Sequence, residues 1–272
     1  MKFQTDLTLG QYAPRHSSIH LLDPRTKMIL LFILMVSIFF IGSIEGLGLF
    51  LVGVLCLYPL ARLDLNLAWN NIRAFIWLFL ITICLHGFFT VGNTLLTIPV
   101  VNWELSKEGL VRGGYYSFRM INLIILASLL TLTTSPMSLT DGLEKLLQPL
   151  ERIRIPAHEI AMVMSISMRF IPILLEETER IRKAQISRGA SFEGSLIKKI
   201  QSLVPILIPL FLSAFRKAND LALAMDARCY RGGTGRTSYQ ILRFTSRDGW
   251  AALCTMLFFA AIVTFETMIN HV

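Results

Sequence analysis

One apolar run decides the fold class of this chain. Residues Ile72–Val91 read IRAFIWLFLITICLHGFFTV, in which Arg73 is the single Lys, Arg, Asp or Glu. A helix needs about 20 predominantly apolar residues to cross the ~30 Å hydrocarbon core of a bilayer, and this run has that length. A second run at Trp250–Ile269, interrupted by Glu266, meets the same requirement. The sequence therefore predicts membrane-spanning helices.

The composition of the whole chain agrees with this prediction. Of the 272 residues, 54% are hydrophobic and 16% are charged, and the mean hydropathy is +0.59, which is too apolar for an ordinary soluble domain. The four cysteines form no CxxC pair and suggest neither a disulfide framework nor a metal site. We predict an all-α integral membrane protein with about five spans: Thr26–Ile41, Gly46–Leu60, Ile72–Val91, Phe118–Thr134 and Trp250–Ile269. The first two should form a hairpin.

Positive charge is concentrated in one block. The formal net charge is +8, and residues 141–247 hold 17 of the 26 Lys and Arg but only 10 of the 18 Asp and Glu. In a membrane protein such an excess marks cytoplasmic segments rather than a nucleic-acid site. We therefore expect three parts: four membrane helices in 1–135, a cytoplasmic region in 136–247, and a last membrane helix in 248–272. The N-terminus should also be cytoplasmic. Arg119, at the outer start of the fourth span, opposes this scheme unless it snorkels or lines the bundle interior.

The basic block has the pattern of amphipathic helices. Apolar residues at helical spacing predict three of them, at Leu139–Ile153, His158–Arg188 and Leu196–Arg228. The apolar centre of the third, Leu203–Phe215, is too short to cross a bilayer. Arg169 argues against a span in the second. Three prolines interrupt the apolar halves and are either simple kinks or hinges that let the helices tilt: Pro172, Pro205 and Pro209.

The second and third of these helices end in similar sequence motifs. Residues 184–190 read AQISRGA, and residues 224–230 read AMDARCY. Each motif places an alanine four positions before an arginine, so that both lie on one helix face. A small exposed residue permits close approach of a partner surface, and the guanidinium offers a rigid fork for carboxylates. The alternative is an ordinary helix end, with an arginine that favours the helix dipole and a glycine cap.

Several stretches together are similar to one known family. They are LDPRTK (22–27), LTLTTSP (130–136), LTDGLE (139–144), MRFIP (168–172), AQISRGA (184–190), and the segment from Ala222 to YRGGTGRT (230–237). In this order, over almost the whole chain, they resemble the T component of energy-coupling factor (ECF) transporters, especially the shared form that serves several vitamin-binding subunits.

This resemblance implies a transport function in a prokaryotic plasma membrane. In the family, two coupling helices each end in an Ala-Arg-Gly motif and dock on two ATP-binding-cassette ATPases. A small hydrophobic S component binds the substrate. By this resemblance, the docking residues of this chain are Ala184, Ser187, Arg188 and Gly189 in the first motif, and Ala224, Ala227, Arg228 and Cys229 in the second. Ser187 stands where the family motif has an alanine, and Cys229 stands where it has the glycine. Because cysteine resists a left-handed cap more than glycine does, the second helix end is expected to differ in shape.

Other functions compete with this interpretation. A permease of a conventional ATP-driven importer would normally carry one docking loop, and a dedicated metal or biotin T component would share the same architecture. An intramembrane enzyme is opposed by the lack of a histidine- or serine-based dyad in any span. The glycine loop at 232–237 lacks the lysine and the spacing of a phosphate loop, so we expect no cofactor on this chain and ATP with Mg on the partner ATPases. The cargo and the S component that selects it are not encoded in these residues.

Overall fold

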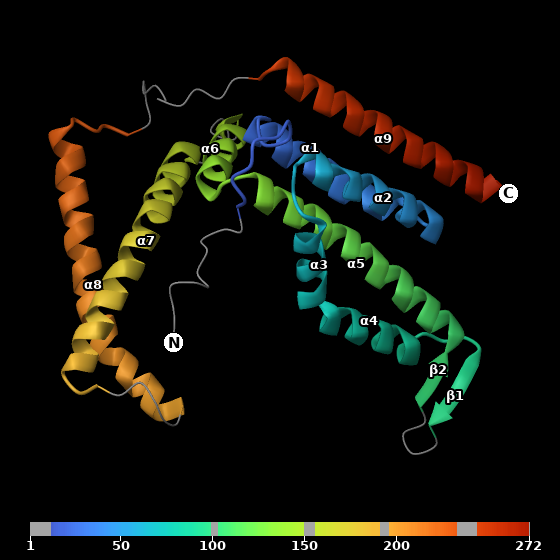
Figure 1. The fold of residues 1–272 in the computed structure, drawn as a ribbon, viewed down its shortest axis with the longest axis horizontal. Helices are drawn as coiled ribbons and strands as arrows, with labels where there is room; N and C mark the ends of the chain where they lie inside the picture. The colour runs from blue at the N-terminus through green and yellow to red at the C-terminus, as the bar shows by residue number, and fades with distance from the viewer. Residues whose placement is uncertain (1–11, 99–102, 150–155, 191–195, 233–243, 272) are drawn as a thin grey trace. The chain divides into compact units, whose positions relative to one another are not determined.

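The computed structural model describes residues 12–98, 103–149, 156–190, 196–232 and 244–271. In chain order the elements are α1 (Pro24–Ser37), η1 (Ile38–Phe40), α2 (Ile44–Leu60), α3 (Leu65–Ala74), α4 (Ile76–Phe89), β1 (Thr94–Ile98), β2 (Trp103–Ser106), α5 (Lys107–Thr133), α6 (Pro136–Leu147), α7 (Ala157–Ser187), α8 (Leu196–Ala227) and α9 (Ser246–His271) (Figure 1). The all-α class is confirmed. The exception is a short antiparallel hairpin of β1 and β2 in the loop before α5.

The chain divides into two compact units. The first unit comprises Met1–Gly142 and Leu242–Val272, and the second comprises Leu143–Ile241. The first therefore contains α1 to α5 and α9, and the second contains α7 and α8.

The core of the first unit forms around α5. This helix packs against α1, α2, α3 and α4. Its Ile125 and Leu126 are almost completely buried, as are Phe50 and Tyr58 of α2. The hydroxyl of Tyr58 donates to the backbone oxygen of Ile125 at 3.1 Å, which satisfies a polar group where no water competes. Together these contacts fix the first hairpin against α5.

The turn between η1 and α2 is held by opposite charges from two other helices. At the turn, Glu266 of α9 accepts hydrogen bonds from the backbone nitrogens of Gly42 and Ser43, both at 2.8 Å, and from the Ser43 hydroxyl at 2.6 Å. On the other side, Arg119 of α5 donates to the backbone oxygen of Ile41 at 3.0 Å. The carboxylate thus meets the amide end of one helix and the guanidinium meets the carbonyl end of the other, as the helix dipoles favour.

Arg119 therefore lines the bundle interior, one of the two places expected for it. Its guanidinium also lies over the rings of Phe39, Tyr115 and Tyr116, with distances to the ring centroids of 5.4, 4.8 and 5.8 Å. Cation–π contacts of this kind stabilise a charge away from water. An arginine held in this way says little about which end of the helix faces the cytoplasm.

The predicted start of the fourth span differs from the start of the helix that contains it. The fourth span was expected to begin at Phe118, but α5 begins at Lys107. Its first turns carry Gly109 and Gly113, which lie before the predicted start of the span. In the structure a Cβ on Gly109 would lie 2.2 Å from the His86 oxygen, and one on Gly113 would lie 2.8 Å from the Ile83 Cα. The glycines thus permit close packing of α4 on α5.

The third span is bent rather than continuous. The predicted run Ile72–Val91 is divided at Phe75, where α3 and α4 meet at 52°. The apolar α4 forms the second part, whereas α3 is amphipathic and carries Asn71, whose amide donates to the Ser128 hydroxyl of α5 at 2.5 Å. The bend thus separates a helix with a polar face from one that is apolar all round.

Length and composition identify further candidate spans. Among the described residues, α5, α9 and residues His158–Ser187 of α7 are each long and apolar enough to cross a membrane, and α3 with α4 passes as one broken span. The apolar α2 is shorter. Because α7 also passes, the number of spans and the cytoplasmic placement of α7 stay predictions.

Candidate functional site

The second unit is built on the antiparallel pair of α7 and α8. An apolar groove of about 290 Å³ lies between them, lined by residues that include Ile166, Phe170 and Leu174 of α7 and Ala218, Ala222 and Met225 of α8. Towards the end of α7, Glu177 and Lys217 form an ion pair at 3.5 Å, and the Gln185 side chain donates to the Pro205 oxygen at 3.4 Å. Early residues of α7 therefore face late residues of α8, and late residues of α7 face early residues of α8.

The end of α7 is a Schellman motif. Arg188 is the cap residue after Ser187, and Gly189 follows with a φ of +89° in the left-handed region. The nitrogen of Gly189 donates to the Ile186 oxygen at 2.9 Å, and that of Ala190 donates to the Gln185 oxygen at 3.0 Å. These two bonds satisfy carbonyls that the helix end would leave open.

The end of α8 has the same shape, although a cysteine replaces the glycine. Cys229 has a φ of +57°, its nitrogen donates to the Asp226 oxygen at 2.9 Å, and the Tyr230 nitrogen donates to the Met225 oxygen at 3.1 Å. The expectation that this end differs in shape was therefore wrong. A left-handed conformation costs a non-glycine residue about 1–2 kcal/mol. The two hydrogen bonds offset that cost.

Both ends are exposed. The side chains of Ala184, Ser187, Arg188, Ala224, Ala227, Arg228 and Cys229 all lie at the surface, and so does Gly189. Within the described part of the chain, no hydrogen bond or ion pair engages either guanidinium of Arg188 or Arg228. Each arginine thus combines a full charge, an open surface and a small residue one turn before it.

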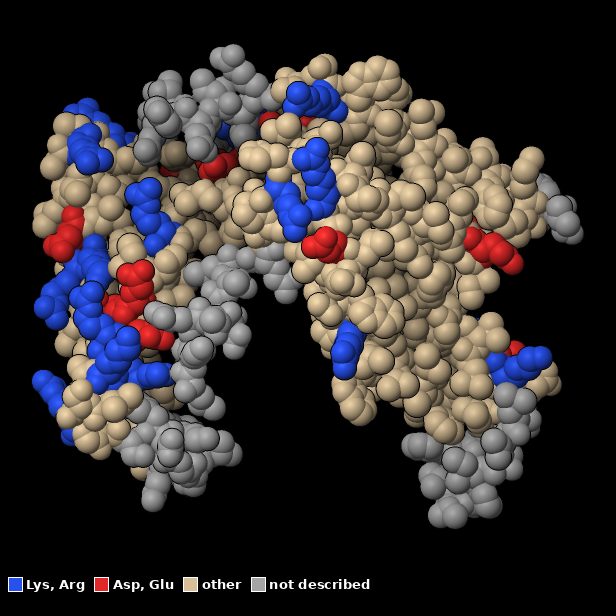
Figure 2. Space-filling view, viewed as in Figure 1, with Lys and Arg blue, Asp and Glu red and all other residues tan. Residues whose placement is uncertain are grey.

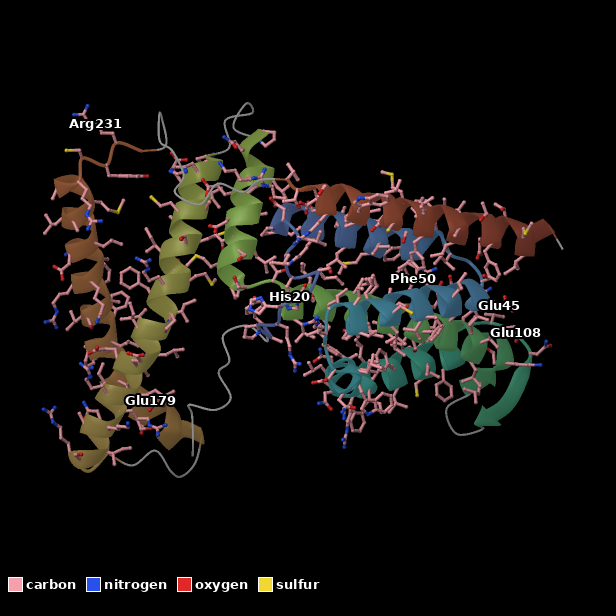
Figure 3. The ribbon with its side chains drawn as sticks, turned by 45° about the horizontal axis from the view of Figure 1, so that its top comes forward. His20, Glu45, Phe50, Glu108, Glu179 and Arg231 are labelled. Carbon is pink, nitrogen blue, oxygen red and sulfur yellow. The ribbon has the colours of Figure 1, made fainter. Side chains whose placement is uncertain are left out.

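The two ends lie at opposite ends of the helix pair. Glu179, near the end of α7, and Arg231, just after α8, are far apart along the pair in Figure 3. Because Gln185 contacts Pro205, the separation follows α8 from Pro205 to Ala227, which is ~33 Å at about 1.5 Å per residue. Two sites so far apart fit two separate partner surfaces better than one.

Basic side chains surround these ends. Figure 2 shows Lys and Arg gathered along the part of the surface formed by α7 and α8, whereas the first unit is mostly uncharged. Exposed members of this set are Arg180, Lys183, Arg188, Arg216, Arg228 and Arg231. Such a surface attracts acidic partners.

The three prolines lie inside the helices. Pro172 is in α7, and Pro205 and Pro209 are in α8, yet both helices continue through them. The α8 ribbon changes direction in its N-terminal part (Figure 1). The glycine loop at 233–237 lies outside the described residues. Among the described residues, no three His, Cys, Asp or Glu side chains are grouped to hold a metal ion.

Comparison with known proteins gives a consistent result. Residues 15–239 match the CbiQ family, described as cobalt transport protein. The chain is 45% identical over 256 residues to the energy-coupling factor transporter transmembrane protein EcfT of Clostridium kluyveri, covering 93% of this chain and 94% of the relative. It is 46% identical over 245 residues to EcfT of Heliobacterium modesticaldum, covering 89% and 91%. It is 40% identical over 263 residues to EcfT of Bacillus subtilis, covering 95% and 97%.

These relatives are named as membrane components of transporters and not as enzymes. The matched region extends from the first helices through both arginine motifs. An apolar helical chain of this kind, matched along nearly its full length, belongs to the family of EcfT transmembrane proteins of energy-coupling factor transporters.

Proposed function

We propose that this chain is the scaffold that couples two ATP-binding-cassette ATPases to a membrane-embedded vitamin-binding S component. The observation that carries the proposal is the matching pair of helix ends in the second unit. Each presents an exposed arginine at a Schellman cap, and the two are separated by the length of the helix pair. The arrangement supports one ATPase at each end. A conventional permease with one docking loop has no use for the second.

The proposed coupling requires a motion of the two arginine ends. When ATP brings the two ATPases together, the arginine ends are displaced, and α7 and α8 carry that displacement to the S component, which reorients and releases its substrate. This chain binds no cofactor itself, and ATP with Mg is held by the ATPases. Cobalt, named in the family description, and a vitamin, as in the shared form, are alternative substrates, and the S component determines which of them is transported.

Co-purification tests the proposal. We expect the full-length chain, isolated from its native membrane in mild detergent, to bring two ATPases and at least one small hydrophobic protein, which mass spectrometry identifies. The chain freed from these partners should hydrolyse no ATP. Isolation without any ATPase, or turnover that survives removal of contaminating ATPases, contradicts the scaffold function.

The cytoplasmic placement of the arginine ends has its own test at Cys229. We expect an impermeant thiol reagent to label a variant with Cys229 as its only cysteine in inverted vesicles and not in intact cells. The positive charge of residues 141–247 is the reason for this orientation. A matched single-cysteine variant at Val91, which is fully exposed after α4, should show the opposite pattern. Labelling of Cys229 in intact cells rules this topology out.

A further inference from the structure

One backbone carbonyl lacks its regular donor in the N-terminal part of α8, where the ribbon changes direction (Figure 1) and two prolines provide a cause for a bend. In an α-helix the oxygen of residue 205 accepts from the nitrogen of residue 209. Residue 209 is a proline and has no N–H to donate. The Pro205 oxygen therefore lacks its regular donor inside the helix.

A side chain of the neighbouring helix supplies a donor. The Nε2 of Gln185 on α7 lies 3.4 Å from the Pro205 oxygen. Glutamine is long enough to cross between two packed helices, and its amide can donate without bringing a charge. The contact thus joins α7 to α8 at the carbonyl that Pro209 leaves open.

Gln185 also belongs to the arginine end of α7. Its backbone oxygen accepts from the nitrogens of Arg188 and Ala190, at 3.1 and 3.0 Å. One residue therefore holds the cap that presents Arg188 and, through its side chain, the bend of the next helix. A displacement of the cap moves Gln185, and the Gln185 side chain then displaces the Pro205 carbonyl of α8.

We infer that Gln185 is a positioning residue that transmits movement of the Arg188 end to the proline bend of α8. This inference rests on the proposed function, in which Arg188 meets an ATPase. The link predicts a specific dependence: Gln185 matters because residue 209 is a proline. Restoring an N–H at position 209 gives the Pro205 oxygen its regular donor and makes the glutamine dispensable.

A double-mutant cycle in the assembled transporter tests this dependence. Gln185→Met keeps the side-chain length and removes the donor, and Pro209→Ala restores the backbone N–H. We measure hydrogen–deuterium exchange of the amides that follow Pro205, and substrate uptake per ATP hydrolysed. With Pro209 present, Gln185→Met should speed exchange at the bend by about 2- to 10-fold, the range for one neutral hydrogen bond, and should lower uptake per ATP. With Pro209→Ala present, Gln185→Met should change neither.

Gln201→Met is the matched control, because Gln201 is an exposed glutamine on α8 and should leave both measurements unchanged. Equal effects of Gln185→Met in the two backgrounds, or none in either, overturn the inference. The two measurements also separate it from the proposed function, since exchange reports the Gln185 link alone. A cycle seen in exchange supports the link even if uptake fails to follow, and the coupling function is then what fails.

Discussion

Reversing both arginines, Arg188→Glu with Arg228→Glu, is expected to abolish assembly with the ATPases and substrate uptake. Each guanidinium is exposed and, among the described residues, unengaged in the isolated chain. If each is buried against carboxylates of a partner, loss of one member of such a pair costs about 2–5 kcal/mol, much of it from the other charge left unpaired. A glutamate adds repulsion. The double variant loses both anchors, whereas each single variant should lose mainly the ATPase bound at its own end.

The measurement is pull-down of each ATPase together with uptake, at matched expression. Arg→Lys at either position should be milder, because lysine keeps the charge and loses the planar fork. Arg180→Glu and Arg231→Glu are the controls, since both residues are exposed and lie near the two ends. If these controls weaken assembly as strongly, the attraction is a general one between basic and acidic surfaces. Normal assembly of the double variant disproves the two-anchor mechanism.

Removing the carboxylate of Glu266 should destabilise the first unit strongly. This buried side chain accepts three hydrogen bonds from the turn at Gly42 and Ser43. Glu266→Ala leaves two backbone N–H groups of the turn without their charged acceptor. Hydrogen bonds to a charged group contribute about 1.5–3 kcal/mol each, so we expect a loss of roughly 3–6 kcal/mol. Glu266→Gln keeps one acceptor oxygen and should lose less.

Thermal unfolding of the purified complex in detergent, followed by size-exclusion chromatography, measures this loss. Thr267→Ala is the control, because Thr267 is exposed and its hydroxyl bonds only within its own helix, to the Thr264 oxygen at 2.8 Å. A melting temperature for Glu266→Ala equal to that of the control shows that the turn does not depend on α9.

The sequence predicted the elements that depend on local pattern. The last helix was expected at Trp250–Ile269 and forms as α9, because an apolar run of that length is decisive in itself. The positions of the helix ends at Arg188 and Arg228 were also predicted, since they follow from a pattern within a few residues. Their role in docking stays a prediction.

What the sequence did not predict depends on distant contacts. Gly109 and Gly113 lie before the predicted start of the fourth span, because their value lies in the approach of α4, which no local pattern reveals. Cys229 was expected to disturb its helix end, but two backbone hydrogen bonds impose the left-handed shape on it. The pairing of Glu266 with Gly42 joins residues 224 positions apart in the sequence. A lone glutamate in an apolar run indicates a buried partner without naming it.

That pairing has a consequence for the order in which the protein is made. The turn between α1 and α2 is synthesised well before its partner, because Glu266 follows Gly42 by 224 residues. Until then the amides of Gly42 and Ser43 have only water or lipid headgroups as partners. The turn of the first hairpin is therefore completed only after α9 has been made, and a chain stopped before α9 lacks the acceptor for these amides.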